Sequence, residues 1–148
     1  MSDRLETWTA LVAVYQAVLH DVVDALEREA GLDSGVYSAL AYLDLADPSG
    51  RLPMSALTRL MHPRYSQPGL SRLVQRMEAD GLVGREADPA DGRAVVLVMT
   101  PSGRSRYRRA HEVYDDALEK HFGAHLTDDE SASLADALYR FTARRAAR

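Results

Sequence analysis

Cysteine is absent from this chain of 148 residues, and Lys120 is its only lysine. Without cysteine, the chain cannot form a disulfide, a thiolate zinc site or a thiol redox switch. We expect no apolar stretch to be long enough to span a bilayer, and the N-terminal MSDRLETW has no signal-peptide pattern. These absences favour a cytoplasmic protein.

Recognisable catalytic and metal-binding arrangements are also missing. The sequence has no Ser/His/Asp or Cys/His spacing, no glycine-rich phosphate loop and no carboxylate pair at the end of a predicted strand. His111 and Asp115 lie four residues apart, as do His121 and His125, but two side chains do not complete a metal site. We therefore expect neither an enzyme nor a bound cofactor or metal.

Positive charge is concentrated in the middle of the chain, although the whole carries a formal charge of −4. Residues 51–109 contain 11 arginines and 5 acidic residues, a formal charge of +6. The remaining residues contain 7 basic and 17 acidic ones, a formal charge of −10. This asymmetry predicts that the centre faces an anion such as nucleic acid. The alternative is a solvated surface in a chain that uses arginine in place of lysine.

Apolar periodicity and capping residues predict six helices. The first is long and amphipathic, from Leu5 to Leu26, because apolar residues recur there at the helical spacing. Residues that favour helix starts place the other five near Asp33, at Pro53 or Ser55, at Ser66, at Thr100 and at Thr127. Helix stops are expected at Gly31, at DPSG (47–50), at MHPRY (61–65) and at Gly81.

Two strands, Val83–Ala87 and Ala94–Met99, are predicted between the fourth and fifth helices and are joined by the turn DPADGR. Two short helices followed by such a hairpin make a winged helix-turn-helix, whose second short helix presents its N-terminal end to the DNA major groove. The predicted fold class is therefore mainly α with a small β wing, a winged helix-turn-helix flanked by N- and C-terminal helices.

The helix that begins at Ser66 carries the side chains that a major groove requires. Polar or small residues lie opposite an apolar face formed by Leu70, Leu73 and Met77. Arginine pairs bidentately with guanine, glutamine pairs with adenine, and serine bonds to bases or phosphates. The DNA-binding candidates on this helix are Ser66, Gln67, Pro68, Gly69, Ser71, Arg72, Gln75 and Arg76. The alternative is an amphipathic helix whose polar face is merely solvated.

The hairpin turn places an arginine, Arg93, at its tip. A wing that projects past the major-groove helix would bring this arginine to the adjacent minor groove, where a narrow groove concentrates negative potential. Asp91 is expected either to hold the Arg93 guanidinium or to cap the turn.

From about Leu57 to Arg104 the sequence resembles the MarR family of bacterial transcription regulators. The resemblance rests on LSRLVQRMEADGLVGREADPADGRAVVLVMTPSGR. In this stretch a helix ends in E-x-x-G-L-V-x-R, a turn of the type D-P-x-D-x-R follows, and T-P-x-G-R comes after the hydrophobic strand. The resemblance implies that Ser66 to Arg76 form the recognition helix and that Asp91 and Arg93 are the wing pair.

One departure from the family pattern lies between the two short helices. The connection MHPRY is longer than the turn that is usual in the family. Arg64 is therefore expected to add a phosphate contact, or else the longer turn changes the angle at which the recognition helix meets DNA.

The resemblance also implies a two-fold dimer made by the first and the last two helices. Apolar stripes on these outlying helices support a dimer on physical grounds, because so short a chain should bury them. The expected organisation is a single domain, 1–148, with a DNA-binding part at 33–100 and dimerisation parts at 1–30 and 101–148. The dimerisation candidates are Leu5, Trp8, Leu11, Val12, Leu134, Leu138 and Phe141.

Members of this family often bind small anionic or aromatic molecules between their dimerisation and DNA-binding parts. By resemblance, the candidates for such an effector site are Tyr15, Tyr37, Tyr42, Tyr107 and His111. The alternative is that these aromatic side chains pack in the core or in an interface.

The sequence therefore predicts a sequence-specific DNA-binding transcriptional regulator. We expect a repressor that binds double-stranded DNA at a pseudo-palindromic operator as a homodimer and that a small-molecule effector can release. The alternative is a winged-helix module that binds protein and has no DNA sequence specificity.

Overall fold

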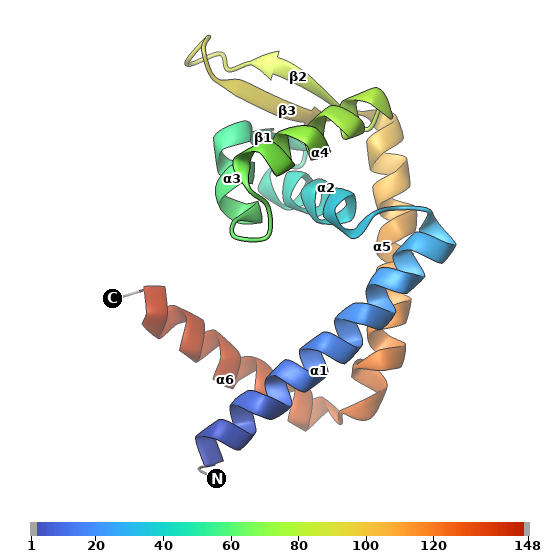
Figure 1. Ribbon diagram of the computed structural model, residues 1–148, viewed down its shortest axis with the longest axis vertical. Helices are drawn as coiled ribbons and strands as arrows, with labels where there is room; N and C mark the ends of the chain where they lie inside the picture. Colours follow the sequence, from blue (N-terminus) through green and yellow to red (C-terminus); the bar gives the residue numbers. More distant parts are fainter. Residues whose placement is uncertain (1–2, 147–148) are drawn as a thin grey trace. The chain divides into compact units, whose positions relative to one another are not determined.

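The computed structural model describes residues 3–146, and Figure 1 shows their arrangement along the chain. The described residues are mainly helical and include one small sheet, so the predicted fold class is confirmed. The elements are α1 (Asp3–Ala25), η1 (Leu26–Ala30), α2 (Ser34–Ala46), β1 (Arg51–Pro53), α3 (Met54–Met61), α4 (Gln67–Ala79), β2 (Val83–Ala87), β3 (Val95–Met99), α5 (Pro101–His121), η2 (Gly123–His125) and α6 (Asp128–Ala146).

The chain divides into two compact units. The central unit runs from Ala25 to Val113, and the terminal unit joins Met1–Asp24 to Tyr114–Arg148. The expected parts had their boundaries near residues 30 and 100, and that functional division stays a prediction. Residues 1, 2, 147 and 148 of the expected terminal parts lie outside the described range.

Local hydrogen bonds explain where the predicted helices begin. The carboxylate of Asp33 accepts bonds from the backbone N–H groups of Gly35 (2.9 Å) and Val36 (3.2 Å) at the start of α2. At the start of α6, the Glu130 carboxylate accepts bonds from the backbone N–H and the hydroxyl of Thr127. These two bonds hold the pKa of Glu130 below its usual value. The expected capping box is confirmed.

A left-handed glycine ends each of two helical segments, as the sequence predicts. Gly31 (φ 59°) follows η1, and Gly81 (φ 69°) follows α4. Beyond α4, the N–H of Leu82 donates to the carbonyl of Met77 at 2.8 Å, which pairs a carbonyl that the helix leaves open. The chain therefore turns sharply from α4 into β2.

The sheet of the central unit has three strands in the order β1-β3-β2 rather than the two that the sequence predicts. Both outer strands pair antiparallel with β3, and Leu52 of β1 lies opposite Leu97. The prediction missed β1 because a strand of three residues that ends in proline has no detectable alternation. The core beneath the sheet is made of fully buried side chains, among them Leu40, Leu43, Leu57, Leu70, Leu73, Met77, Leu82 and Leu97.

The first helical run is longer and more apolar than we expected from the sequence. Asp3–Ala30 comprises 28 residues, and its most apolar window has a mean hydropathy of 1.3 with few charges. By length and composition alone this run can cross a membrane, so the expectation that no stretch is long enough is wrong. The large apolar residues of this run are separated by alanine and threonine, so the sequence shows no uniformly hydrophobic stretch although the run is long. Helices of soluble proteins pass the same test, so the run alone does not indicate a membrane protein.

In the terminal unit, α1 and α5 are joined by a polar contact between His121 Nδ1 and Asp21 Oδ2 at 3.1 Å. Several large apolar side chains of this unit nevertheless stay exposed: Leu5, Trp8, Leu11, Val14, Tyr15, Leu19, Leu138, Tyr139 and Phe141. Such an accumulation on two helices is unusual for a monomer.

Candidate nucleic-acid interface

Helix α4 has one buried face and one polar face. Its buried side chains Leu70, Leu73, Val74 and Met77 face α2, α3 and β2, against which the helix packs. Beside the polar face lies a shallow hollow of about 530 Å³ lined by Gly69, Arg72, Gln75, Arg76 and Ala79, and by Leu73 from the buried face. The structure therefore brings four of the predicted DNA-binding residues, Gly69, Arg72, Gln75 and Arg76, onto a single open surface.

The N-terminal end of α4 is capped by Ser66. Its hydroxyl accepts a bond from the N–H of Gly69 at 3.2 Å, and Pro68 occupies the first turn. Gln67 and Pro68 are exposed, whereas Gly69 and Ser71 are half-buried. The remaining N–H groups and the positive end of the helix dipole favour an anion in front of this turn.

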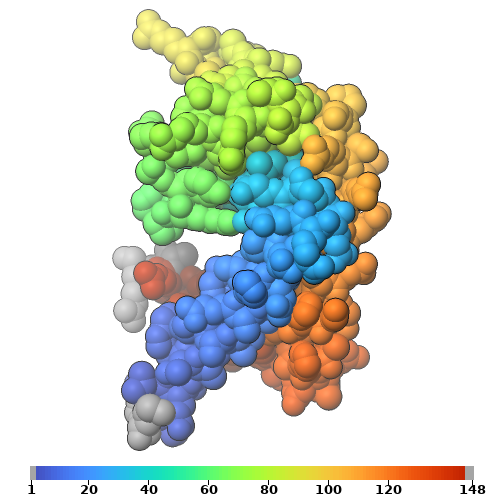
Figure 2. All heavy atoms as spheres, turned by 45° about the vertical axis from the view of Figure 1, so that its right-hand side comes forward, coloured from blue at the N-terminus to red at the C-terminus, as the bar shows by residue number. Residues whose placement is uncertain are grey.

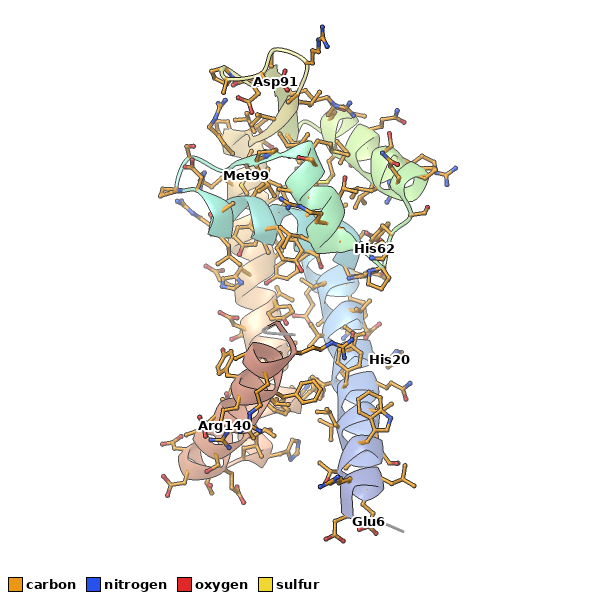
Figure 3. The ribbon with its side chains drawn as sticks, turned by 90° about the vertical axis from the view of Figure 1, so that its left-hand side faces the viewer. Glu6, His20, His62, Asp91, Met99 and Arg140 are labelled. Carbon is orange, nitrogen blue, oxygen red and sulfur yellow. The ribbon has the colours of Figure 1, made fainter. Side chains whose placement is uncertain are left out.

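The hairpin β2-β3 extends beyond the rest of the central unit, as Figure 2 shows in yellow. Its strands pair in register from Val83–Met99 to Ala87–Val95. At the tip, the carboxylate of Asp91 accepts a bond from the backbone N–H of Arg93 at 3.1 Å. The sequence left two roles open for Asp91, holding the Arg93 guanidinium or capping the turn. In the structure Asp91 caps the turn. Figure 3 labels this residue at the end of the hairpin.

Two arginines at the strands of the hairpin sheet, Arg85 and Arg51, form ion pairs. Arg85 pairs with Glu78 of α4 at 2.8 Å, and Arg51 of β1 pairs with Glu86 of β2 at 2.6 Å. Within residues 3–146, Arg93 has no such ion pair and its side chain is exposed. Arg93 is thus the cation of the hairpin that remains available to an anionic partner.

The base of the hairpin is fastened to α4 and α5 by Thr100. Its hydroxyl lies 2.6 Å from the carbonyl oxygen of Gly81 and 3.1 Å from that of Leu82, and it accepts the N–H of Gly103 at 2.9 Å. Gly103 packs so closely that a Cβ there would collide with the Leu82 carbonyl. The T-P-x-G-R sequence is therefore a joint that holds the end of α4 and the hairpin together.

Arg104 completes this joint on its other side. Its guanidinium pairs with Asp44 of α2 at 3.1 Å and donates to the carbonyl of Pro48 at 3.2 Å. Gly50 has φ 72°, and a Cβ at this position would collide with Met99 and with the Arg104 guanidinium. Neither the ion pair of Arg104 nor the close approach at Gly50 was predicted, although Gly50 was expected in a helix stop and T-P-x-G-R is part of the family resemblance.

Arg64 lies on the turn between α3 and α4, but its guanidinium is directed at α2. It donates to the hydroxyls of Ser34 at 2.6 Å and Ser38 at 3.4 Å. Neither partner was predicted, because both lie far from Arg64 in the sequence and their role depends on the packing of the turn.

Three of the effector candidates come together in the central unit. The hydroxyl of Tyr37 lies 2.8 Å from Nδ1 of His111, and the Tyr107 ring lies 5.8 Å from that of Tyr37 and 5.5 Å from that of His111. Tyr37 and Tyr107 are buried, while His111 is exposed. Tyr42 is half-buried in the same unit, and Tyr15 belongs to the terminal unit.

The dimerisation candidates all lie in the terminal unit, on α1 and α6. Val12 and Leu134 are half-buried, and the exposed members are Leu5, Trp8, Leu11, Leu138 and Phe141. Within residues 3–146, no group of three or more His, Asp or Glu side chains is arranged to hold a metal ion.

Comparison with known proteins gives a family match and a set of similar folds. The MarR family model matches residues 30–94. AbsC, a MarR family transcriptional regulator from Streptomyces coelicolor, is 24% identical with a TM-score of 0.84, over 100% of this chain and 98% of that one. Sco3205, another MarR family regulator from Streptomyces coelicolor, solved in complex with DNA, is 24% identical with a TM-score of 0.81, over 96% and 91%.

A third similar structure is the organohalide-sensing transcriptional regulator RdhR-CbdbA1625 in its 2,4-dichlorophenol-bound form. It is 17% identical with a TM-score of 0.77, over 97% of this chain and 82% of that one. At these identities the structures establish a shared fold, and no curated protein matches the chain. The family match and the fold together confirm the resemblance that the sequence motifs indicated.

Proposed function

We propose that this chain, which has the fold of MarR family transcriptional regulators and matches the family model over residues 30–94, is a sequence-specific DNA-binding repressor. The observation that carries the proposal is the pairing of an open polar face on α4 with a projecting hairpin whose arginine is uncommitted. A DNA major groove accepts a helix such as α4, and the adjacent minor groove accepts the arginine of the hairpin. The solved complex of Sco3205 with DNA supports the same partner.

In this proposal the protein works in the cytoplasm as a homodimer joined through the exposed apolar side chains of α1 and α6. A two-fold dimer presents two copies of α4 about one DNA turn apart, which matches a pseudo-palindromic operator. The proposal needs no cofactor.

A small aromatic or anionic effector is proposed to bind at Tyr37, Tyr107 and His111. Two buried tyrosine rings beside an exposed imidazole offer both a stacking surface and a hydrogen-bonding edge. The dichlorophenol-bound form of RdhR-CbdbA1625 supports an aromatic ligand for this fold. Binding of the effector would release the protein from its operator.

The experiment that tests the function is selection of bound DNA from a random pool, followed by fluorescence anisotropy at several salt concentrations. We expect a palindromic consensus and an affinity that falls steeply with salt, because bound phosphates release counterions. Weak binding that is indifferent to both sequence and salt would contradict DNA recognition and favour the protein-binding alternative.

Replacing Arg93 with alanine is expected to weaken operator binding about tenfold, because the hairpin loses its available cation at the minor groove. The side chain is exposed, so the melting temperature should not change. Anisotropy with the selected operator measures the effect. Arg85→Ala is the matched control, since Arg85 is already paired with Glu78. Equal losses in both variants would show that Arg93 has no special position.

Arg72→Ala is expected to change specificity at one position of each half-site. Arg72 lies exposed on the open face of α4, where a bidentate pair with guanine contributes about 1–3 kcal/mol of discrimination. Competition with operators that carry single base-pair changes should show relaxed preference at one base pair and unchanged preference elsewhere. A uniform loss across all competitors would instead identify Arg72 as a phosphate contact.

A further inference from the structure

The turn between α3 and α4 is fastened to the first turn of α2 at two points. The first is Arg64, whose Nη2 donates to Ser34 Oγ at 2.6 Å. The second is Tyr65, whose hydroxyl occupies the space beside Gly35, where a Cβ would collide with it. Gly35 is buried, so the close approach depends on its lack of a side chain. Figure 3 labels His62 in this turn.

These two contacts act directly at the end of α4 that meets DNA in the proposed function. Tyr65 immediately precedes Ser66, the N-cap of α4. The Arg64 guanidinium also lies 5.6 Å from the centre of the Tyr65 ring, so the two side chains support each other. A shift of this turn would therefore move the first turn of α4.

The geometry of the guanidinium separates two possible roles for Arg64. Its Nη groups are directed at two hydroxyls of α2, Ser34 and Ser38, and both acceptors are neutral. A phosphate contact that turned the guanidinium away from α2 would break the 2.6 Å bond to Ser34 and release the turn from α2.

We propose that Arg64 is a positioning residue that sets the direction of α4 through Ser34, and that it does not act as a phosphate contact. The proposal rests on the proposed DNA-binding function and concerns how that function becomes sequence-specific. Base-edge hydrogen bonds require correct placement of the helix, whereas phosphate attraction tolerates a small tilt.

Two variants test the proposal from opposite sides of the bond. Arg64→Met removes the guanidinium, while Ser34→Ala removes its acceptor and leaves the positive charge in place. Asp33, not Ser34, caps α2, so Ser34→Ala spares the helix start. We expect both variants to lower the ratio of operator to random-DNA affinity by about fivefold or more, with the salt slope of binding unchanged.

A phosphate contact gives a different pattern, which would overturn the proposal. Arg64→Met would then reduce the salt slope by about one and leave the affinity ratio intact, and Ser34→Ala would change neither. A lower ratio in Arg64→Met alone would also overturn it, because Arg64 would not be acting through Ser34. Arg59→Met is the control, since it removes an exposed arginine of α3 that is not part of this contact.

Hydrogen exchange on the DNA-free protein provides a second readout. The amides of residues 65–69 should exchange faster in Arg64→Met and Ser34→Ala than in the wild type and in Arg59→Met. The buried amides of Leu73 and Met77 should be unaffected. Unchanged exchange at residues 65–69 overturns the proposal. Absence of operator binding by the wild type itself contradicts the proposed function instead.

Discussion

The Trp8→Asp variant is expected to be a monomer at concentrations at which the wild type is a dimer. The Trp8 side chain is 63% exposed on α1, where Leu5 and Leu11 are also large, apolar and exposed. In the proposed dimer this indole is buried, and tryptophan is among the residues that contribute most to interfaces. A carboxylate at that place loses the apolar contact and adds an unpaired charge to the interface.

We expect the dimer dissociation constant to rise at least about 100-fold. Sedimentation equilibrium across a range of protein concentrations measures it, and operator affinity should fall with it because a monomer contacts only one half-site. Leu45→Asp is the control: Leu45 is 80% exposed but belongs to the central unit. A wild type that is monomeric throughout, or a Trp8→Asp dimer of normal stability, would contradict the proposed assembly.

Gly103→Ala is expected to destabilise the fold by about 2–3 kcal/mol, the scale of an overpacked core position. In an open helix the same change stabilises, because alanine is the better helix former. Here the added methyl group would collide with the Leu82 carbonyl, which is backbone and cannot rotate away. The joint made by Thr100 would have to open, so the free energy of unfolding should fall.

Urea unfolding monitored by circular dichroism measures this change. Gly84→Ala is the matched control, because a Cβ at Gly84 meets no atom within 4 Å. Its effect should stay within about 0.5 kcal/mol, as is usual for surface substitutions. A stability of Gly103→Ala equal to that of the wild type would mean that the Leu82 carbonyl can move at little cost.

Features that depend on neighbouring residues were predictable from the sequence. Helix ends depend on contacts within a few residues, so the local sequence locates them. Examples are the carboxylate of Asp33, the hydroxyl of Ser66 and the left-handed Gly81. The same holds for the hairpin, whose register follows from the turn between β2 and β3.

Features that depend on distant pairing were not predictable. Strand β1 exists because three residues pair with β3, which lies more than forty residues further along the chain. The direction of Arg64 is likewise decided by Ser34, thirty residues away. For Asp91, both candidate partners were close in sequence, and only the geometry of the tip distinguishes the backbone N–H from the guanidinium.

Helix α4 is held at its two ends by groups that do not belong to its open face. Ser66 and the anchored turn fix one end, and Gly81 with Thr100 fixes the other. Arg72, Gln75 and Arg76 contribute to neither attachment. Substitutions at these three positions can therefore accumulate in a lineage without loss of the fold, so that operator preference can drift, or be redesigned, on an unchanged scaffold.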